Sequence, residues 1–213
     1  MTVVVCAAHA DDEVIGAGGT IAKIAKKEDV IVIIFSYGIS FASRASSMPL
    51  LMSEENLTKV RVAESKKAGV ILGVKETIFL GMRYDLTKEI NEEQKKKIMD
   101  ILDKYKPRAI YFHSLKDGHK DHRAVYYTMD GIIKKMKGKP EKYTYQINLF
   151  DFSEKEPKVI VDVSDEFRKK LEALEQFKSQ RIWTMPIKFL ILLKGIFFGK
   201  RHGFKFAEYF YAE

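Results

Sequence analysis

The sequence predicts a single α/β domain in which helices flank a mainly parallel sheet. Strand-like segments alternate with amphipathic helical segments along the chain, a pattern typical of right-handed βαβ units. Several of the strand-like segments are continuous apolar runs, which indicates strands buried on both faces. The chain has 213 residues and shows no internal repeat or linker-like stretch, so we expect one domain over residues 1–213.

The first elements follow from apolar runs and helical periodicity. Small and β-branched residues at 3–8 predict a buried strand, and apolar residues at helical spacing predict a helix over 13–27. A second buried strand is expected at 30–35. Residues 37–56 carry Ser, Gly and Met without a clear period. A connection of this length in a compact domain is often a lid or a binding loop.

The remaining segments continue the alternation. Charge and apolar spacing predict helices over residues 58–68, 91–105, 119–137 and 166–180, and strands at 77–80, 109–113, 143–152 and 159–163. Ser164 or Asp165 is expected to cap the last of these helices.

Residues 183–200 form an unusually apolar segment that is interrupted by Lys188, Lys194 and Lys200. The segment is too short and too charged to span a bilayer. One interpretation is a helix that faces the core or a second subunit, as in a homo-oligomer. The other is a membrane-surface contact, because basic residues flank the apolar face.

The net charge of +8 comes from 37 basic and 29 acidic residues. It favours an anionic substrate, an acidic membrane surface or a nucleic acid. No zinc finger or RNA-binding aromatic motif accompanies the charge, so nucleic-acid binding is not expected. The sequence begins without a secretory-signal pattern, and the single Cys6 lies inside a predicted strand. We therefore expect a cytoplasmic protein with a buried thiol.

Two clusters of polar side chains follow the predicted strands at 3–8 and 109–113. Ligands of open α/β sheets bind beyond the carboxyl ends of the strands. The two clusters are therefore expected on the same rim. Their members are His9, Asp11, Asp12 and Glu13 in the first, and His113, Lys116, Asp117, His119, Asp121 and His122 in the second.

Imidazoles and carboxylates on one rim predict a metal-assisted hydrolase. Three successive carboxylates, Asp11 to Glu13, repel one another unless a cation compensates, although plain capping of the next helix is an alternative. His9, Asp12 and His122 would supply the three ligands that catalytic zinc takes while it leaves a position for water. Iron or another divalent transition metal also suits such ligands, whereas Mg²⁺ prefers oxygen. Asp11 would serve as the base.

His119 and His122 are three residues apart, so they are neighbours on one face of a starting helix. One of them can bind metal while the other reaches the substrate oxygen. Asp121 would then fix the tautomer of the second ring.

Three short runs resemble the motifs of a known family. They are His9-Ala10-Asp11-Asp12-Glu13, the small residues Gly16-Ala17-Gly18-Gly19, and His119-Lys120-Asp121-His122. With them the sequence resembles the PIG-L/LmbE family of zinc-dependent N-acetylglucosamine deacetylases, which has A-H-P-D-D-E and H-P-D-H at these places. Further agreement lies in Arg61-Val62-Ala63-Glu64, Ala68, Leu72-Gly73, Phe79-Leu80-Gly81, Asp85, Ser179-Gln180 and Ala207-Glu208-Tyr209-Phe210.

The resemblance implies a Rossmann-like, three-layer α/β/α fold and hydrolysis of the N-acetyl group of an aminosugar. It implies that His9, Asp12 and His122 bind the metal, that Asp11 is the general base, and that His119, held by Asp121, stabilises the oxyanion. Arg61 and Asp85 would contact the substrate. A surface ion pair with Glu64 is the alternative for Arg61.

Two departures from the family pattern bear on the substrate. Ala10 and Lys120 replace prolines, which leaves a looser turn and adds a charge that favours an anionic substrate. The 37–56 stretch lacks the expected Gly-rich pattern. The group attached to the sugar stays open, as do two further alternatives, a non-sugar amide and a lipid-linked aminosugar met at a membrane surface.

Overall fold

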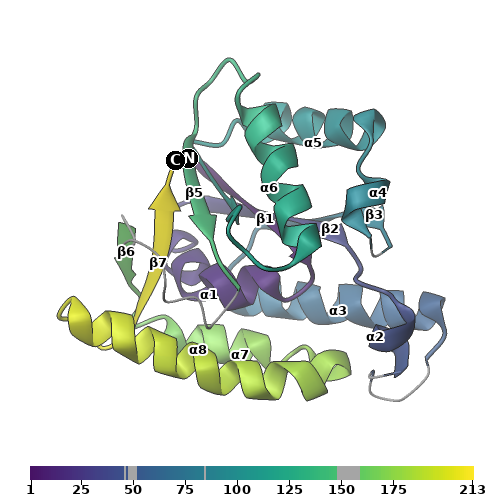
Figure 1. The fold of residues 1–213 in the computed structure, drawn as a ribbon. Helices are drawn as coiled ribbons and strands as arrows, with labels where there is room; N and C mark the ends of the chain where they lie inside the picture. The colour runs from purple at the N-terminus through teal and green to yellow at the C-terminus, as the bar shows by residue number, and fades with distance from the viewer. Residues whose placement is uncertain (46, 48–51, 84, 148–158) are drawn as a thin grey trace.

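The computed structural model describes residues 1–45, 47, 52–83, 85–147 and 159–213. Over these residues it shows a seven-stranded sheet of order β3-β2-β1-β4-β5-β7-β6 between helical layers (Figure 1). β1 to β5 pair in parallel, whereas β7 runs antiparallel to both β5 and β6. The predicted α/β class with a mainly parallel sheet is confirmed. The strands are β1 (Thr2–His9), β2 (Asp29–Ser36), β3 (Glu76–Met82), β4 (Ala109–His113), β5 (Glu141–Tyr145), β6 (Val159–Asp162) and β7 (Ala207–Ala212).

Helices cover both faces of the sheet. One face carries α1 (Asp12–Ile24), α3 (Glu54–Leu72), α7 (Phe167–Leu174) and α8 (Arg181–Arg201), and the other carries α4 (Leu86–Glu89), α5 (Glu92–Tyr105) and α6 (Lys120–Ile133). Two short elements, α2 (Phe41–Ala45) and the 3₁₀ turn η1 (Lys178–Gln180), lie in connections.

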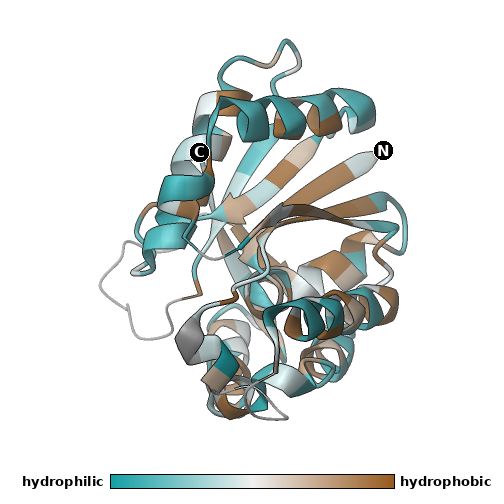
Figure 2. Cartoon of the chain, turned by 90° about the vertical axis from the view of Figure 1, so that its right-hand side faces the viewer, coloured by the Kyte–Doolittle hydropathy of each residue, from teal (hydrophilic) through white to brown (hydrophobic). Residues whose placement is uncertain are grey.

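The central strands are buried on both faces, as their continuous apolar runs predict. In β1, Val3, Val5 and Ala7 pack into the core shared with α1 and α7, while Val4 and Cys6 pack into the core shared with α5 and α6. Figure 2 shows hydrophobic residues concentrated in these strands. The sheet therefore separates two hydrophobic cores.

Glycines bring α1 close to the sheet. A Cβ at Gly16 would lie 2.3 Å from Cδ2 of Tyr145, and a Cβ at Gly19 would lie 2.8 Å from Cβ of Val163. The Tyr145 ring is itself fixed, because its hydroxyl donates a hydrogen bond to the Cys6 carbonyl at 2.7 Å. Larger side chains at these positions would push α1, and the residues at its N-terminus, away from the strands.

Several predicted boundaries move in the structure. The stretch 37–56 contains α2 and the first turn of α3, where the Ser53 side chain accepts a hydrogen bond from the Asn56 amide. The helix predicted over 166–180 ends at Leu174 and is followed by η1. The strand predicted over 143–152 is β5, which ends at Tyr145, and residues 148–152 lie outside the described residues.

The predicted cap of α7 is wrong. Glu166 occupies the N-cap position, and the Ser164 hydroxyl donates instead to the Asp162 carboxylate at 2.5 Å. The short helix α4 and the strand β7 were not expected from the sequence. β7 completes the sheet between β5 and β6.

The connections that leave β1 and β4 diverge. β1 and β4 are neighbours in the sheet, yet β1 leads into α1 on one face and β4 leads into α6 on the other. Such a divergence leaves a crevice beyond the carboxyl ends of the two strands, where open α/β sheets bind ligands.

Candidate active site

A cavity of about 440 Å³ lies at this crevice. Its size falls within the range of small-molecule sites. The motifs after β1 and β4 meet in it, as the sequence predicts. Its walls are formed by His9, Asp11, Asp12, Ile15, Gly38, Ser40, Ser43, Arg61, His119, Lys120, Asp121, His122, Ile147, Gln180 and Ile187.

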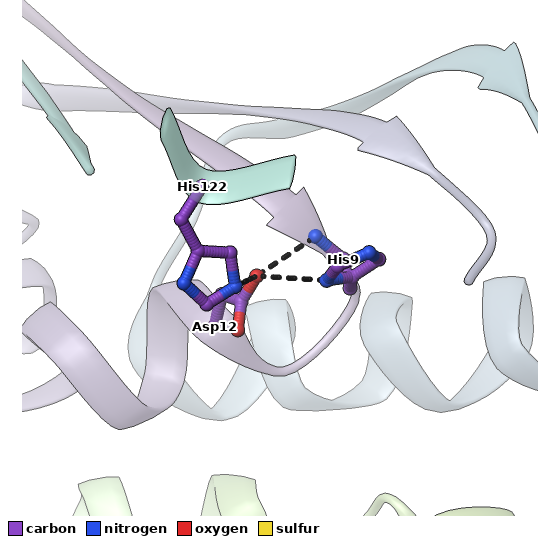
Figure 3. A group of neighbouring side chains, drawn as sticks. All are labelled: His9, Asp12 and His122. Atoms are coloured by element: carbon purple, nitrogen blue, oxygen red, sulfur yellow. Dashed lines mark hydrogen bonds and ion pairs between the residues drawn. The ribbon is translucent and has the colours of Figure 1, made fainter. Parts of the chain in front are cut away.

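Asp12 lies at the centre of the charged side chains. Its Oδ2 accepts a hydrogen bond from the His9 amide at 2.9 Å and lies 3.4 Å from Nδ1 of His9 and 3.3 Å from Nε2 of His122 (Figure 3). Burial would raise the pKa of Asp12, but the facing imidazoles hold it well below its usual range. Burial would likewise lower the pKa of His122, but Asp12 and Asp117 raise it to about 10. Asp12 is therefore an anion surrounded by imidazoles.

The donor atoms of His9, Asp12 and His122 lie within 4.8 Å of one another. Two overlapping groups among the described residues satisfy the same limit, His9 with His119 and Asp121, and His113 with Asp117 and His122. Two imidazole nitrogens and a carboxylate oxygen are the ligand types of catalytic zinc and of related transition metals. The predicted ligand set therefore fits a divalent transition metal.

Asp117 and His113 hold the His122 ring from behind. Asp117 Oδ1 lies 2.9 Å from Nδ1 of His122, and Asp117 Oδ2 accepts a hydrogen bond from the Ile147 amide at 2.9 Å. The His113 ring is fully buried and stacks on His122 with 4.0 Å between ring centroids. Burial and the charge of His122 lower the pKa of His113 to about 4, so its ring is neutral. Such outer contacts orient a ligand and fix its tautomer.

Asp11 stands at the N-cap position of α1 with φ of 126° and ψ of −28°, outside the regions that L-residues favour. Its side chain makes no capping hydrogen bond, so plain capping does not explain it. Its amide donates to the Glu13 carboxylate at 3.1 Å. Burial, together with the charge of Asp12, raises the pKa of Asp11 to about 7. Backbone strain and a raised pKa are both typical of functional residues.

His119 is the N-cap residue of α6 and is half exposed. Its Nδ1 accepts a hydrogen bond from the Asp121 amide at 3.2 Å. The Asp121 carboxylate lies 3.2 Å from Nε2 of His9 but 4.0 Å from Nδ1 of His119, and it accepts a hydrogen bond from the Leu86 amide. The structure thus brings Asp121 closer to His9 than to His119.

Arg61 is buried rather than at the surface. Its Nη1 donates to the carbonyls of Tyr37 and Gly38 at 2.6 and 2.7 Å. Burial lowers the pKa of its guanidinium. The partner that the sequence suggested, Glu64, instead accepts hydrogen bonds from the amide and hydroxyl of Ser179. Arg61 therefore fixes the start of the loop after β2 at the edge of the cavity.

Lys120 and Asp85 form an ion pair, with 2.8 Å between Nζ and Oδ2. Lys120 lines the cavity, and Asp85 holds its ammonium from the side of α4. Gln180 had no assigned role in the sequence, yet its carboxamide donates to the Ala10 carbonyl at 2.9 Å. This contact holds the turn between His9 and Asp12, where proline is replaced by Ala10.

Comparisons with known proteins agree with this geometry. A family model described as GlcNAc-PI de-N-acetylase, PIG-L, matches residues 4–133. A diacetylchitobiose deacetylase from Thermococcus kodakarensis is 26% identical in an alignment 219 positions long, which covers 94% of this chain and 78% of the relative.

Solved structures share the fold. The N,N'-diacetylchitobiose deacetylase from Pyrococcus horikoshii, complexed with its inhibitor MPG, matches with a TM-score of 0.79 and 24% identity over 100% of this chain and 83% of that one. The 4-carboxy-2-hydroxymuconate hydratase from Pseudomonas putida matches with a TM-score of 0.80 and 21% identity, over 99% and 95% of the two chains. At these identities the likeness concerns the fold alone.

The family match decides the assignment. It spans more than half of the chain and includes both motif clusters, from His9 at the end of β1 to His122 in α6. The resemblance seen in the sequence is thereby confirmed, and the chain belongs to the PIG-L family of de-N-acetylases.

Proposed function

We propose that the protein hydrolyses the N-acetyl group of an N-acetylglucosaminyl compound and releases acetate and a free amine. The observation that carries the proposal is that Asp11 lies beside a metal-competent triad in one cavity of small-molecule size. The family to which the chain belongs and the activity named for its Thermococcus relative support the choice of an aminosugar.

His9, Asp12 and His122 are the proposed metal ligands, with zinc as the first candidate and Fe²⁺ as the second. A metal held there supplies Lewis-acid chemistry, since it lowers the pKa of a water and polarises an acyl oxygen. The donor set supports this assignment, because three protein ligands leave room for water and substrate.

Asp11 is the proposed general base. It accepts a proton from the water that attacks the acyl carbon, and it returns that proton to the amine as the carbon–nitrogen bond breaks. A base works best when its pKa lies near the working pH, and the burial of Asp11 supports this role.

His119 is the proposed donor to the oxyanion. Burial, and then the positive charge in the His122 and His9 group, lower the pKa of His119, which favours a neutral ring. Its Nδ1 accepts the Asp121 amide, and the ring proton therefore lies on Nε2. A neutral Nε2–H can donate to the acyl oxygen as negative charge develops. Asp121 positions His119 through its backbone and His9 through its carboxylate.

Arg61, Lys120 and Asp85 are the proposed substrate contacts. Arg61 and Lys120 line the cavity. The Nε of Arg61 is buried without a hydrogen-bond partner among the described residues, which supports a polar contact to a ligand. Asp85 holds Lys120 in place. An anionic group on the substrate would bind beside Lys120.

Two further points stay proposals. Residues 1–213 are proposed to work as one domain, because β7, near the end of the chain, pairs with β5 in the sheet that begins with β1. A cytoplasmic location stays a prediction of the sequence.

The test measures free-amine release from a panel of N-acetylglucosaminyl compounds, together with metal content by mass spectrometry. The zinc-loaded wild type should release amine. Asp11→Asn should lose about 10²–10⁴-fold in rate and His119→Ala about 10²–10³-fold, both with metal retained. His122→Ala should lose the metal itself.

Two outcomes would contradict these assignments. Silence of the metal-bound wild type across the panel would exclude the sugar substrates and favour another amide. A His119→Ala protein of normal fold that has lost its metal would place His119 among the ligands rather than at the oxyanion.

A further inference from the structure

We propose that α8 docks the protein on an anionic lipid surface. The helix carries an exposed apolar line, which we call the α8 stripe and which has side chains between 48% and 61% exposed. The spacing of its members by three or four residues places them along one side of the helix. They are Ile182, Met185, Phe189, Leu193 and Phe197.

The opposite side of α8 already provides its packing. Ile191 is buried in the core, and a Cβ at Gly195 would lie 2.7 Å from the Phe167 ring. A Cβ at Gly199 would lie 2.8 Å from the backbone of Lys205. The stripe is therefore not the face that holds α8 on the domain, and its members Ile182, Met185, Phe189 and Leu193 are about half exposed or more.

The charge of the protein is concentrated around the stripe. Residues 176–207 contain seven Lys and Arg and no Asp or Glu, whereas the rest of the chain has 30 basic and 29 acidic residues. Arg181 at one end of the helix and Lys200 and Arg201 at the other are exposed. An apolar line with cations at both ends matches a surface of acyl chains beneath anionic headgroups.

A groove of about 240 Å³ opens beside the N-terminal end of the stripe. Lys178, Arg181 and Lys188 line it together with Met185. The acid that lines it, Glu175, pairs with Lys188. Within the described part of the chain, Lys178 and Arg181 form no ion pair, so both can meet a phosphate group next to the exposed Met185.

A second copy of the chain is a poorer partner for the stripe. Pairing two stripes would bring together two segments that carry only cations, and like charges repel across an interface. Insertion across the membrane does not apply either, because no helix in the described part of the chain is long and apolar enough to cross one. A position in the plane of an anionic surface satisfies both the apolar and the cationic groups.

Helix α8 lies next to the candidate active site. Ile187 of α8 and Gln180 just before it line the catalytic cavity, and Figure 1 shows α8 along the lower edge of the molecule. Docking through the stripe would therefore hold the cavity near the surface. The proposal does not depend on the deacetylase chemistry.

The experiment is co-sedimentation of the full chain with vesicles of phosphatidylcholine, alone or mixed with phosphatidylglycerol. Wild type should bind the mixed vesicles at least about tenfold more tightly, and binding should fall with added salt. Phe189→Ser/Leu193→Ser and Lys200→Glu/Arg201→Glu should each lose about tenfold. The matched control is Val70→Ser/Tyr127→Ser, which changes residues that are 78% and 64% exposed on α3 and α6 and should bind like wild type.

Three results would overturn the proposal. One is wild type that stays in the supernatant with the mixed vesicles. Another is an equal loss in the control variant. The last is a dimer, seen by analytical ultracentrifugation without lipid, that Phe189→Ser/Leu193→Ser dissolves, since this would assign the stripe to a second copy. Asp11→Asn should bind vesicles normally, which separates docking from catalysis.

Discussion

Two groups of buried charges lie along α1, and they differ in how completely the protein satisfies them. Near the middle of the helix, Glu208 of β7 accepts hydrogen bonds from the amides of Gly19 and Thr20 at 2.9 and 2.7 Å and from the Lys170 ammonium at 2.5 Å. Lys170 also donates to the Ile15 carbonyl. Among the described residues, both charged groups thus find their partners within the protein.

The group at the N-terminus of α1 is incomplete. Asp11, Asp12 and Glu13 are three successive acids, and burial raises the pKa of Asp11 to about 7 and that of Glu13 to about 8. The imidazoles that face Asp12 are also side chains of a type that binds transition metals. A buried charged group therefore indicates a structural role when its partners are all internal, and a functional one when they are not.

The largest expected effect tests the complete group. Lys170→Met leaves the Glu208 carboxylate buried without its ammonium, which should lower the free energy of unfolding by about 3–5 kcal/mol in a urea titration. The exposed neighbour Lys169→Met is the control and should change it by less than about 0.5 kcal/mol. A loss below about 1 kcal/mol for Lys170→Met would mean that Glu208 is not held as a buried anion.

The next effect tests whether the two groups are coupled through the helix. Gly16→Ala places a methyl group against the Tyr145 ring, which should cost about 1–3 kcal/mol and weaken zinc binding as the N-terminus of α1 shifts. Gly131→Ala in α6 meets nothing within 4 Å and should instead stabilise by about 0.5–1 kcal/mol. Unchanged zinc affinity in Gly16→Ala, measured by competition with a chelator, would show that the site tolerates movement of α1.

A smaller effect is expected from the backbone strain at Asp11, which belongs to the incomplete group. Asp11→Asn and Asp11→Gly both remove the carboxylate, but glycine alone adopts a φ of 126° without strain. The glycine variant should therefore unfold with a free energy about 1 kcal/mol higher than the asparagine variant. Equal stabilities would show that the backbone at this position is relaxed.

The smallest effect is that of an ordinary ion pair at the amino ends of the strands. Arg108 donates to both oxygens of Glu28 at 2.7 Å, and this contact lowers the pKa of Glu28. Because the pKa of Glu28 is lowered in the folded state, the ion pair stabilises the fold fully at pH values above 4.5, the ordinary pKa of the group. This stabilisation is lost as the pH falls through the lowered pKa. Arg108→Gln should cost less than about 1 kcal/mol at pH 7 and still less at pH 3. A cost that does not vary with pH would exclude the ion pair as its source.

The sequence predicted best where a pattern is local. The strand at residues 109–113 was predicted with the observed bounds, and β1 within one residue at each end, because strands buried on both faces are continuous apolar runs. The sequence analysis did not predict β7. Its six residues form a strand because they pair with β5 and β6, and this pairing exists only in the tertiary fold. The cap of α7 failed because the Ser164 hydroxyl has a closer partner in Asp162.

The candidate site shows the same division. The rule that ligands bind at the carboxyl ends of strands was enough to bring together His9, Asp12 and His122. This rule did not predict that His113 packs on His122. The sequence alone does not show which helix covers each face of the sheet, so it does not show what a side chain on either face will contact. It also did not reveal Gln180, which reaches Ala10 from 170 residues away.

The contacts of Glu208 also set an order of events during synthesis. Glu208 lies 188 residues after Thr20, whose amide it binds, so α1 lacks its buried partner until residue 208 has left the ribosome. Long-range contacts of this kind form late, after much loop-closure entropy has been lost. The nascent chain can therefore form β1 and β2 early, but metal loading is expected to follow the release of β7.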